Sequence, residues 1–366
     1  MKGVPTVITI SLCMIVKNEE ESLGRCLGSV QSLVDEIIIV DTGSTDRTKE
    51  IAEQYNAKIY DFEWINDFAA ARNYSFSLAT MEYIWWLDAD DVLLEKDREK
   101  LLQLKSTFDR SIDSLAMDYH LNTGPDGKPT FSMKRNRIVR RACGFQWHGF
   151  VHEYLAVHGN IVPSAIAVTH QKNKEYTSRN LDIYEEHRAK QTPFSPRETY
   201  YYANELKDHR QFENAIIQYQ AFLDTKQGWI EDVIAASCKI ADCYEAIDKI
   251  DEALAAILKS LEYAVPRAES VFRLGRYFMH RDALEQAIFW LSMATTLEPP
   301  QESWGMQQSG YWTWLPHVQL CICYYRKGDM IKSYYHNEIA LTYHPDDEMM
   351  LNNRKLLLPY QPDGPE

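Results

Sequence analysis

The sequence lacks the cysteine pattern of a disulfide-stabilised or zinc-stabilised protein. It contains 7 cysteines in 366 residues, an odd number, and no CxxC pair has a second pair to complete a metal site. Cysteine spacing of this kind argues against a disulfide framework and against a structural zinc site. We therefore expect a reducing compartment, the cytoplasm.

Positive charge and long apolar runs are also scarce. The 39 Lys and Arg residues stand against 53 Asp and Glu residues, which gives a formal net charge of −14. Such a surface repels phosphate backbones and acidic membranes, so we expect no nucleic-acid partner. The apolar run at residues 4–16 is too short for a membrane span and is followed directly by Lys17. Its β-branched residues instead predict a strand buried on both faces, and we expect no membrane span.

The pattern of apolar residues changes about halfway along the chain, which predicts two domains, 1–190 and 191–366. In the first, strand-like runs alternate with amphipathic stretches, so we expect an α/β domain with a parallel sheet. Residues 114–170 are expected to add antiparallel strands at one edge, and Ser44 or Thr45 to cap a helix. The expected strands are residues 9–16, 36–40, 58–60 and 83–87, and the expected helices are residues 20–31, 45–55 and 67–79.

Small residues recur in pairs through the second half of the chain. The pairs, each twelve positions apart, are Ala203/Ala215, Ala241/Ala253, Gly275/Ala287 and Cys321/Ser333. Small side chains at these points let two antiparallel helices approach closely, and Pro299 and Pro345 end the second helix of a pair. The pattern resembles the tetratricopeptide repeat, with an aromatic-rich insertion at residues 303–315. We therefore expect an all-α helical repeat domain; the alternative is an unrelated helical bundle.

Three polar motifs follow predicted strands, at the edge where open α/β sheets bind ligands. They are Met14–Glu20 (MIVKNEE), Asp41–Asp46 (DTGSTD) and Trp86–Asp91 (WLDADD). Asp41 can accept a hydrogen bond from the N–H of a base. Asp88 and Asp90 point the same way if the strand geometry continues, and two convergent carboxylates select Mg²⁺ or Mn²⁺. Each motif alone also fits a solvated turn or a helix cap, but together they indicate a nucleotide site.

Residues 9–100 resemble glycosyltransferase family 2, inverting enzymes of the GT-A fold. The segments that carry this resemblance are ISLCMIVKNEEESLGRCLGSV, EIIIVDTGSTDRT, DFAAARNYSFSLAT and YIWWLDADDVL. The resemblance implies a hexosyltransferase that uses a UDP-sugar, of the glucose or N-acetylglucosamine type, with Mn²⁺ or Mg²⁺ as cofactor. The residues it implies for the nucleotide sugar are Val16, Asn18, Glu20, Asp41, Arg72, Asp88 and Ala89, and those for the metal are Asp88 and Asp90.

A catalytic base is expected in the run Gly144–Glu153 (GFQWHGFVHE), since an inverting transfer must deprotonate its acceptor. The run matches the W-x-G-x-V-H-E pattern associated with these enzymes. Glu153 is the candidate base and His152 the nearest rival. Trp147 either stacks on the sugar or fills the core.

Two further assignments concern the same region. His170 follows a strand-like segment and is expected to complete the metal site, as a late histidine does in several GT-A enzymes. Glu153 has a structural alternative, because a carboxylate pairs readily with a nearby arginine. The arginines close to it in sequence are Arg137, Arg140 and Arg141.

Fusion to helical repeats resembles the subgroup that glycosylates peptides and proteins, including S-glycosyltransferases that modify cysteines of glycocin-type bacteriocins. It implies a peptide or protein acceptor, modified at Cys or Ser/Thr and held by the repeats, with Trp304–Trp314 as exposed anchors. The alternatives are a catalytically weak scaffold for protein binding and a transferase for a cell-surface glycan. A nucleotidyltransferase is disfavoured because its Gly-rich loop is missing. The sequence is compatible with a monomer or a homodimer.

Overall fold

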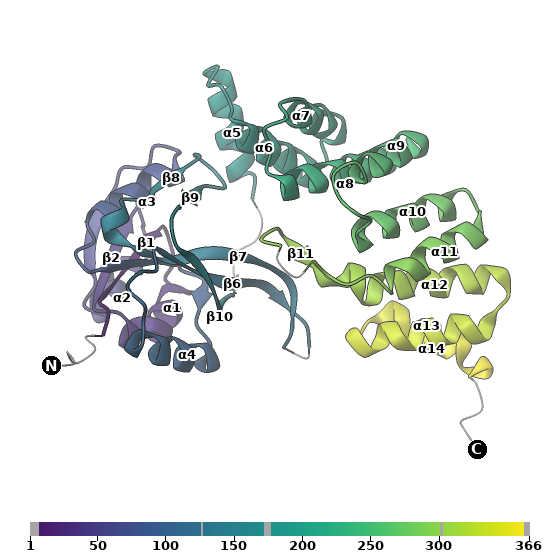
Figure 1. Cartoon of the computed structure of the whole chain (residues 1–366), viewed down its shortest axis with the longest axis horizontal. Helices are drawn as coiled ribbons and strands as arrows, with labels where there is room; N and C mark the ends of the chain where they lie inside the picture. Colours follow the sequence, from purple (N-terminus) through teal and green to yellow (C-terminus); the bar gives the residue numbers. More distant parts are fainter. Residues whose placement is uncertain (1–6, 126, 172–176, 301–302, 362–366) are drawn as a thin grey trace. The chain divides into compact units, whose positions relative to one another are not determined.

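The computed structural model describes residues 7–125, 127–171, 177–300 and 303–361. The chain divides into two compact units (Figure 1). The first consists of Met1–Asn122 and Ser132–Gln191, and the second of Thr123–Phe131 and Thr192–Glu366. Within the described residues, no helix combines the length and the apolar character that crossing a membrane requires.

The first unit is built on one large mixed sheet with the strand order β3-β2-β1-β4-β7-β6-β10-β5. The strands are β1 (Ile10–Val16), β2 (Glu36–Asp41), β3 (Lys58–Asp61), β4 (Tyr83–Trp86), β5 (Asp91–Val92), β6 (Ser114–Thr123), β7 (Pro129–Arg140) and β10 (Ile161–His170). Strands β3, β2, β1 and β4 run parallel, which confirms the predicted parallel core. Strand β7 is antiparallel to β4, as expected, but β10 pairs parallel with β6, so the edge is mixed.

Helices and a hairpin cover both faces of this sheet (Figure 1). The helices are α1 (Leu23–Val30), α2 (Thr48–Gln54), α3 (Phe68–Ser77) and α4 (Glu95–Ser106), and the hairpin joins β8 (Gln146–His148) to β9 (Tyr154–Ala156). Helix α5 (Arg179–Ala189) follows β10 and contacts the loop after β8. Alternate residues of β1 enter two cores: Leu12 packs with Leu27 of α1, and Cys13 with Phe76 of α3. Burial on both faces explains why this strand is apolar at almost every position.

Two predicted helix starts and one predicted cap are wrong. Helix α1 begins at Leu23 rather than at residue 20, and α2 begins at Thr48 without a capping side chain. Ser44 and Thr45 instead bond to Asn18 of the neighbouring loop: the Asn18 N–H donates to Ser44 Oγ at 2.9 Å, and the Thr45 N–H donates to Asn18 Oδ1 at 2.8 Å. Bonds between the loops therefore take the place of a helix cap.

The second unit is a stack of helix pairs. Its helices are α6 (Pro196–Asp208), α7 (Phe212–Asp224), α8 (Ile230–Ala246), α9 (Ile250–Ser260), α10 (Ala268–His280), α11 (Leu284–Ala294), α12 (Trp314–Lys327), α13 (Met330–Tyr343) and α14 (Glu348–Leu357). The eight small residues predicted to mark the pairs are all buried. A Cβ on Gly275 would lie 2.5 Å from Leu291 Cγ of the partner helix, and Ser333 Oγ donates to the Cys321 carbonyl at 2.9 Å. The predicted helical repeats are confirmed.

The aromatic insertion packs inward, so the expectation of exposed tryptophan anchors is wrong. Trp304, Trp312 and Trp314 are all half-buried. Trp312 packs against the core formed by α10, α11 and α12, and Trp314 against the core of α12, α13 and α14. Aromatic side chains of this size stabilise a fold mainly by the area they bury, so Trp312 and Trp314 serve the repeat core.

Candidate active site

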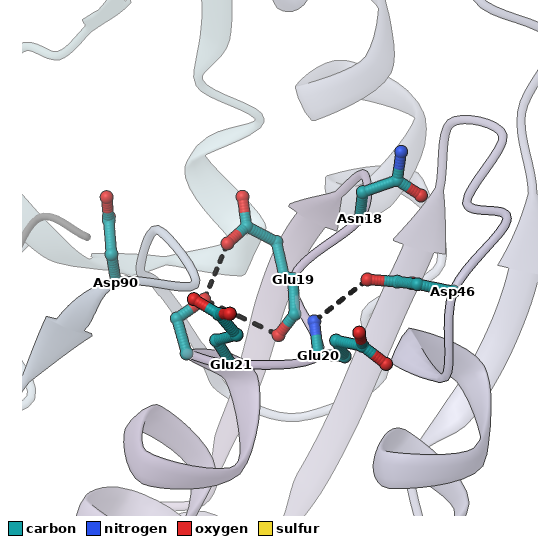
Figure 2. Close-up of a pocket in the computed structure, with 7 residues that line it drawn as sticks. Asn18, Glu19, Glu20, Glu21, Asp46 and Asp90 are labelled. Atoms are coloured by element: carbon teal, nitrogen blue, oxygen red, sulfur yellow. Dashed lines mark hydrogen bonds between the residues drawn. The ribbon is translucent and has the colours of Figure 1, made fainter. Parts of the chain in front are cut away.

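The loops after β1 and β2 are joined into one wall of the site (Figure 2). Asn18 adopts a left-handed backbone conformation, with φ of 53°, and the Glu20 N–H donates to Asp46 Oδ2 at 3.1 Å. Between this wall and Asp90 lies an open hollow of about 160 Å³. It is lined by Asn18, Glu19, Glu20, Glu21, Ser22, Asp46 and Asp90. So many carboxylates in one hollow favour a bound cation over an uncompensated anion.

Asp41 ends β2 and is almost completely buried, with 1% of its surface exposed. Its Oδ1 accepts hydrogen bonds from the N–H groups of Gly43 and Ser44, at 2.9 and 2.8 Å. Its Oδ2 is buried and has no hydrogen-bond partner among the described residues. An unpaired buried acceptor is costly, so this oxygen points to a ligand donor. Beside it, Val16 is buried, and its carbonyl accepts the Thr42 N–H at 2.9 Å.

Asp88 and Asp90 were expected to point the same way on a continued strand. This expectation does not hold, because the chain turns after β4. The Asp91 N–H donates to the Asp88 carbonyl at 3.1 Å, which closes the turn around the buried Ala89. Asp88 Oδ1 consequently lies 2.6 Å from an Arg72 nitrogen. Burial raises the pKa of Asp88, but the charges of Arg72 and Arg137 outweigh burial and lower its pKa to about 2.

The residues that could hold a metal are Asp90, Asp91 and His170, whose ligand atoms lie within 4.8 Å of one another. Asp91 thus stands in this group where the sequence had placed Asp88. His170 Nδ1 lies 3.3 Å from Asp90 Oδ1 and 3.5 Å from Asp91 Oδ1. Burial lowers the pKa of His170, but its bonds to the two carboxylates raise that pKa to about 10. Two carboxylates and an imidazole form a donor set that fits Mn²⁺ or Mg²⁺.

Within this group, the negative charge of Asp91 is already balanced by protein side chains. It is fully buried, and its Oδ2 lies 3.1 Å from an Arg137 nitrogen. Its Oδ1 accepts a hydrogen bond of 2.8 Å from the Tyr119 hydroxyl. Asp90 and His170 are therefore the more open ligands. Asp91 could have been found as the third acid of the DADD run, whereas no local signal marks Arg137 or Tyr119.

Arg72 joins the turn to the predicted base. Its Nε donates to Glu153 Oε1 at 2.5 Å, so Glu153 pairs with Arg72 and not with the arginines close to it in sequence. The guanidinium carbon lies 4.8 Å from the ring centroids of both Trp86 and Trp147. Burial lowers the pKa of Arg72, but Asp88 and Glu153 raise it above its ordinary value.

Trp147 and the loop that follows it are firmly packed. Trp147 is 3% exposed, and its ring meets the Trp86 ring edge-on at 4.8 Å, which is the core alternative to sugar stacking. His152 is half-buried and has a φ of 52°. The Phe150 ring stacks on His187 of α5 at 3.9 Å, and Tyr184 of α5 donates to the Val151 carbonyl at 3.5 Å.

Comparisons with known proteins relate the first half of the chain to a family of transferases. The family description "Glycosyl transferase family 2" matches residues 11–158. The chain is 48% identical over 144 residues to a TPR repeat-containing protein of Synechococcus elongatus, covering 39% of this chain and 34% of that protein. It is 28% identical over 240 residues to the SPbeta prophage-derived glycosyltransferase SunS of Bacillus subtilis, covering 60% of this chain and 56% of that protein. The chain thus spans about a third to just over half of these relatives.

Two solved structures are each similar to a part of the chain. A TPR protein of Thermus thermophilus aligns with a TM-score of 0.39 and 14% identity, covering 50% of this chain and 90% of that one. Glucosyl-3-phosphoglycerate synthase of Mycobacterium tuberculosis aligns with a TM-score of 0.27 and 22% identity, covering 31% of this chain and 44% of that one. These scores are low, and the fold assignment rests on the topology itself. Residues 11–158 thus form a domain that matches the description of glycosyltransferase family 2, and helices that resemble tetratricopeptide repeats follow that domain.

Proposed function

We propose that the chain transfers a sugar from a UDP-sugar to a peptide or protein side chain, with inversion at the anomeric carbon. The observation that carries the proposal is the meeting of three strand exits at one sheet edge. Asp41 ends β2 there with an unpaired buried oxygen, and Asp90 follows β4 with its ligand atom within 4.8 Å of those of Asp91 and His170. Such an edge is the usual ligand site of an open α/β sheet.

In this proposal Asp41 reads the base of the donor. Its Oδ1 is committed to backbone N–H groups, so its Oδ2 remains to accept the N–H of a uracil. Asp41→Asn would place an NH₂ donor at that position without changing the shape of the side chain. We expect it to weaken UDP binding about tenfold to hundredfold, from the roughly 1–3 kcal/mol of an unpaired buried group. Asp61→Asn, an exposed aspartate at the end of β3, is the matched control.

Asp90, Asp91 and His170 would hold a divalent cation, which supplies positive charge to the diphosphate as it leaves. Asp88 stays deprotonated because of its arginine neighbours, and it remains available to the ribose hydroxyls as an acceptor. The rest of the nucleotide would lie against Asn18 and Glu20, which line the hollow beside Asp90. Calorimetry of UDP with Mn²⁺ and with EDTA tests the cation: equal affinity in both would exclude it.

Glu153 is the proposed base. Arg72 holds its Oε1, and no hydrogen bond from the described residues reaches its Oε2, which is therefore available to take the acceptor proton. His152 is the rival. Glu153→Gln and His152→Ala should be compared for kcat with a hydroxyl acceptor, and the variant that loses about 10²–10⁴-fold identifies the base. A cysteine acceptor should depend less on either residue, because a thiol with a pKa near 8.5 is already partly ionised at neutral pH.

The helical repeats would hold the acceptor, since stacked helix pairs present an extended concave surface. The test of the whole proposal is to incubate the chain with Mn²⁺ and a panel of nucleotide sugars, with and without cysteine- and serine-containing peptides. Sugar release is measured for hydrolysis, and mass spectrometry and NMR of the product give the modified residue and the anomer. Absence of both UDP binding and hydrolysis would instead favour a protein-binding scaffold.

A further inference from the structure

We infer that Arg72 is a positioning residue that fixes the base Glu153 relative to the donor-side carboxylate Asp88. This inference rests on the proposed function. One guanidinium bonds both groups through different nitrogens, at 2.5 Å to Glu153 Oε1 and 2.6 Å to Asp88 Oδ1. Because the guanidinium is rigid and planar, two bonds to it fix the separation of the two carboxylates.

The surroundings of Arg72 leave its guanidinium little freedom. Its exposed fraction is 6%, and Trp86 and Trp147 lie on it at equal distances of 4.8 Å. The Trp86 ring also contacts the guanidinium of Arg137, at 4.0 Å, so it lies against two arginines. A buried cation held by two rings and two carboxylates stays in one orientation, because any other orientation leaves a charge unpaired.

The next residue of α3 holds the other end of the same catalytic run. Asn73 Oδ1 accepts the Trp147 N–H at 2.8 Å, and Asn73 Nδ2 donates to the Trp147 carbonyl at 3.0 Å. Arg72 and Asn73 therefore anchor residues 147 and 153, the two ends of the W-x-G-x-V-H-E run. The Ala-Arg-Asn step thus attaches the run with the proposed base to helix α3.

This arrangement separates positioning from donor binding. Two nitrogens of Arg72 are already engaged by Glu153 and Asp88. A residue that mainly bound the diphosphate would have to present those nitrogens to the ligand. A lysine in place of Arg72 would keep a cation beside Asp88 but release Glu153 from its fixed geometry, so it should lower kcat while donor affinity stays nearly unchanged.

The test compares Arg72→Lys, Glu153→Gln and the double variant, measuring kcat, donor KM and the Kd of UDP with Mn²⁺. Lysine keeps the charge but cannot bond both carboxylates in fixed geometry. We expect Arg72→Lys to lower kcat about tenfold to hundredfold, as displacement of a reacting group does, with the Kd of UDP changed less than about twofold. In the Glu153→Gln background it should cost almost nothing more. A raised Kd, or losses that multiply, would overturn the inference.

Two further measurements keep the test decisive. If Arg72→Lys does not fold, Asn73→Ala loosens the same run without removing a charge, and it should also lower kcat at constant UDP affinity. A normal kcat, or weaker UDP binding, in Asn73→Ala would count against the inference. Hydrogen exchange of residues 149–153 should speed up in both variants, and unchanged exchange would overturn the positioning role. Absence of transfer by the unmodified chain would refute the proposed function, while the exchange result would still test positioning.

Discussion

The two units both bury charged side chains, but they arrange them differently. In the first unit the buried and half-buried charges converge on one sheet edge. Arg72 pairs there with Asp88, the Asp88 N–H donates to Asp91, and Asp91 pairs with His170. In the second unit they are spread along the helices at intervals of one or more turns. Charged groups that crowd together at one edge are only partly neutralised by their neighbours. Charged groups that are spaced along helices can each pair with an opposite charge on the next helix.

The second arrangement is a ladder between neighbouring repeats. Arginines in α10 and at its N-cap pair with acids of α8: the N-cap Arg267 lies 2.7 Å from Glu231, Arg273 lies 2.7 Å from Asp242, and Arg276 bonds Glu245. Each rung joins the first helix of one repeat to the first helix of the next. Paired in this way, these three arginines and three acids join neighbouring repeats and stabilise the stack. The two units therefore differ in how their buried charges are arranged. Clustered charges mark the candidate active site, and charges paired between helices mark the helical repeats.

The largest effect should come from the convergent set. Asp90→Asn removes a proposed metal ligand and should lower transfer at least about a hundredfold, because it removes charge stabilisation of several kcal/mol. The melting temperature should change by no more than about 2 °C, since the residue lies in a turn and contributes little packing. Asp282→Asn, an exposed acid of the repeats, is the control and should change neither. Equal losses in both variants would abolish the distinction between the units.

The ladder should matter for stability instead. Arg273→Met leaves Asp242 without its cation and should destabilise the second unit by about 3 kcal/mol, lowering its transition by roughly 6–12 °C in calorimetry. Arg281→Met removes the solvent-exposed pair with Asp251 and should leave the transition unchanged. UDP binding should be normal in both variants. If Arg273→Met weakened UDP binding while remaining folded, the ladder would have a functional role after all.

Two helical glycines sharpen the comparison of packing. A Cβ on Gly275 would lie 2.5 Å from Leu291 Cγ, whereas a Cβ on Gly24 of α1 would lie 3.6 Å from Ile51 Cγ2, an ordinary contact. Gly275→Ala should therefore destabilise the second unit by about 1–3 kcal/mol through overpacking. Gly24→Ala should be neutral or slightly stabilising, because alanine favours a helix by about 0.5–1 kcal/mol. Urea titration of both variants checks this, and a stable Gly275→Ala would mean that the helix pair can separate without cost.

The smallest expected effect is a difference in pH dependence. Burial raises the pKa of Asp232 to about 6, although Arg197 opposes this rise. The folded unit then holds that proton more tightly than the unfolded chain, whose aspartates have a pKa near 3.9. The stability from this proton is present below about pH 4 and is lost as the pH rises towards 6. Asp232→Asn should flatten the pH dependence of the second unit's melting between pH 4 and 6, and an unchanged slope would contradict the assignment.

Glu36 in the first unit provides the opposite case. Burial raises its pKa, but bonds from Lys58, Ser11 and Thr80 outweigh burial and lower that pKa to about 2. Its stabilisation is therefore present above an unfolded pKa of about 4.3 and is lost as the pH falls towards 2. Glu36→Gln should lower the melting temperature at neutral pH. Near pH 2 the melting temperatures of the variant and the unmodified chain should become equal. It serves as the control for the sign of the Asp232 effect.

Much of the fold was predictable because its signals are local and periodic. The parallel strands and the small-residue pairs, such as Cys321 with Ser333, follow from regular patterns within short segments. The start of α2 was not predictable from capping rules, since Ser44 and Thr45 bond to Asn18 in a loop 26 and 27 residues away. Long-range bonds of this kind outcompete local preferences and leave no local trace.

For the candidate site, the sequence likewise predicted the residues that are marked by local patterns and missed the contacts between distant segments. The acids at the strand exits were found because they lie directly after apolar runs. The exchange of Asp88 for Asp91 was not, because the turn at Ala89 ends the alternation on which the prediction depended. The partner of Glu153 was also missed: Arg72 lies 81 residues away, and only the folded sheet brings the two together.

Helix α5 has a consequence for how transferases and repeat arrays can be recombined. Through Tyr184 and His187 it supports the loop that carries Glu153, although it follows the last sheet strand and directly precedes the repeats. We therefore expect that repeat arrays can be exchanged, in evolution or in protein engineering, at a junction within residues 190–195, beyond α5. A junction placed at the end of β10 would remove α5 and leave the loop that carries the proposed base Glu153 without the contacts of Tyr184 and His187. The first unit thus extends one helix beyond its last sheet strand, β10.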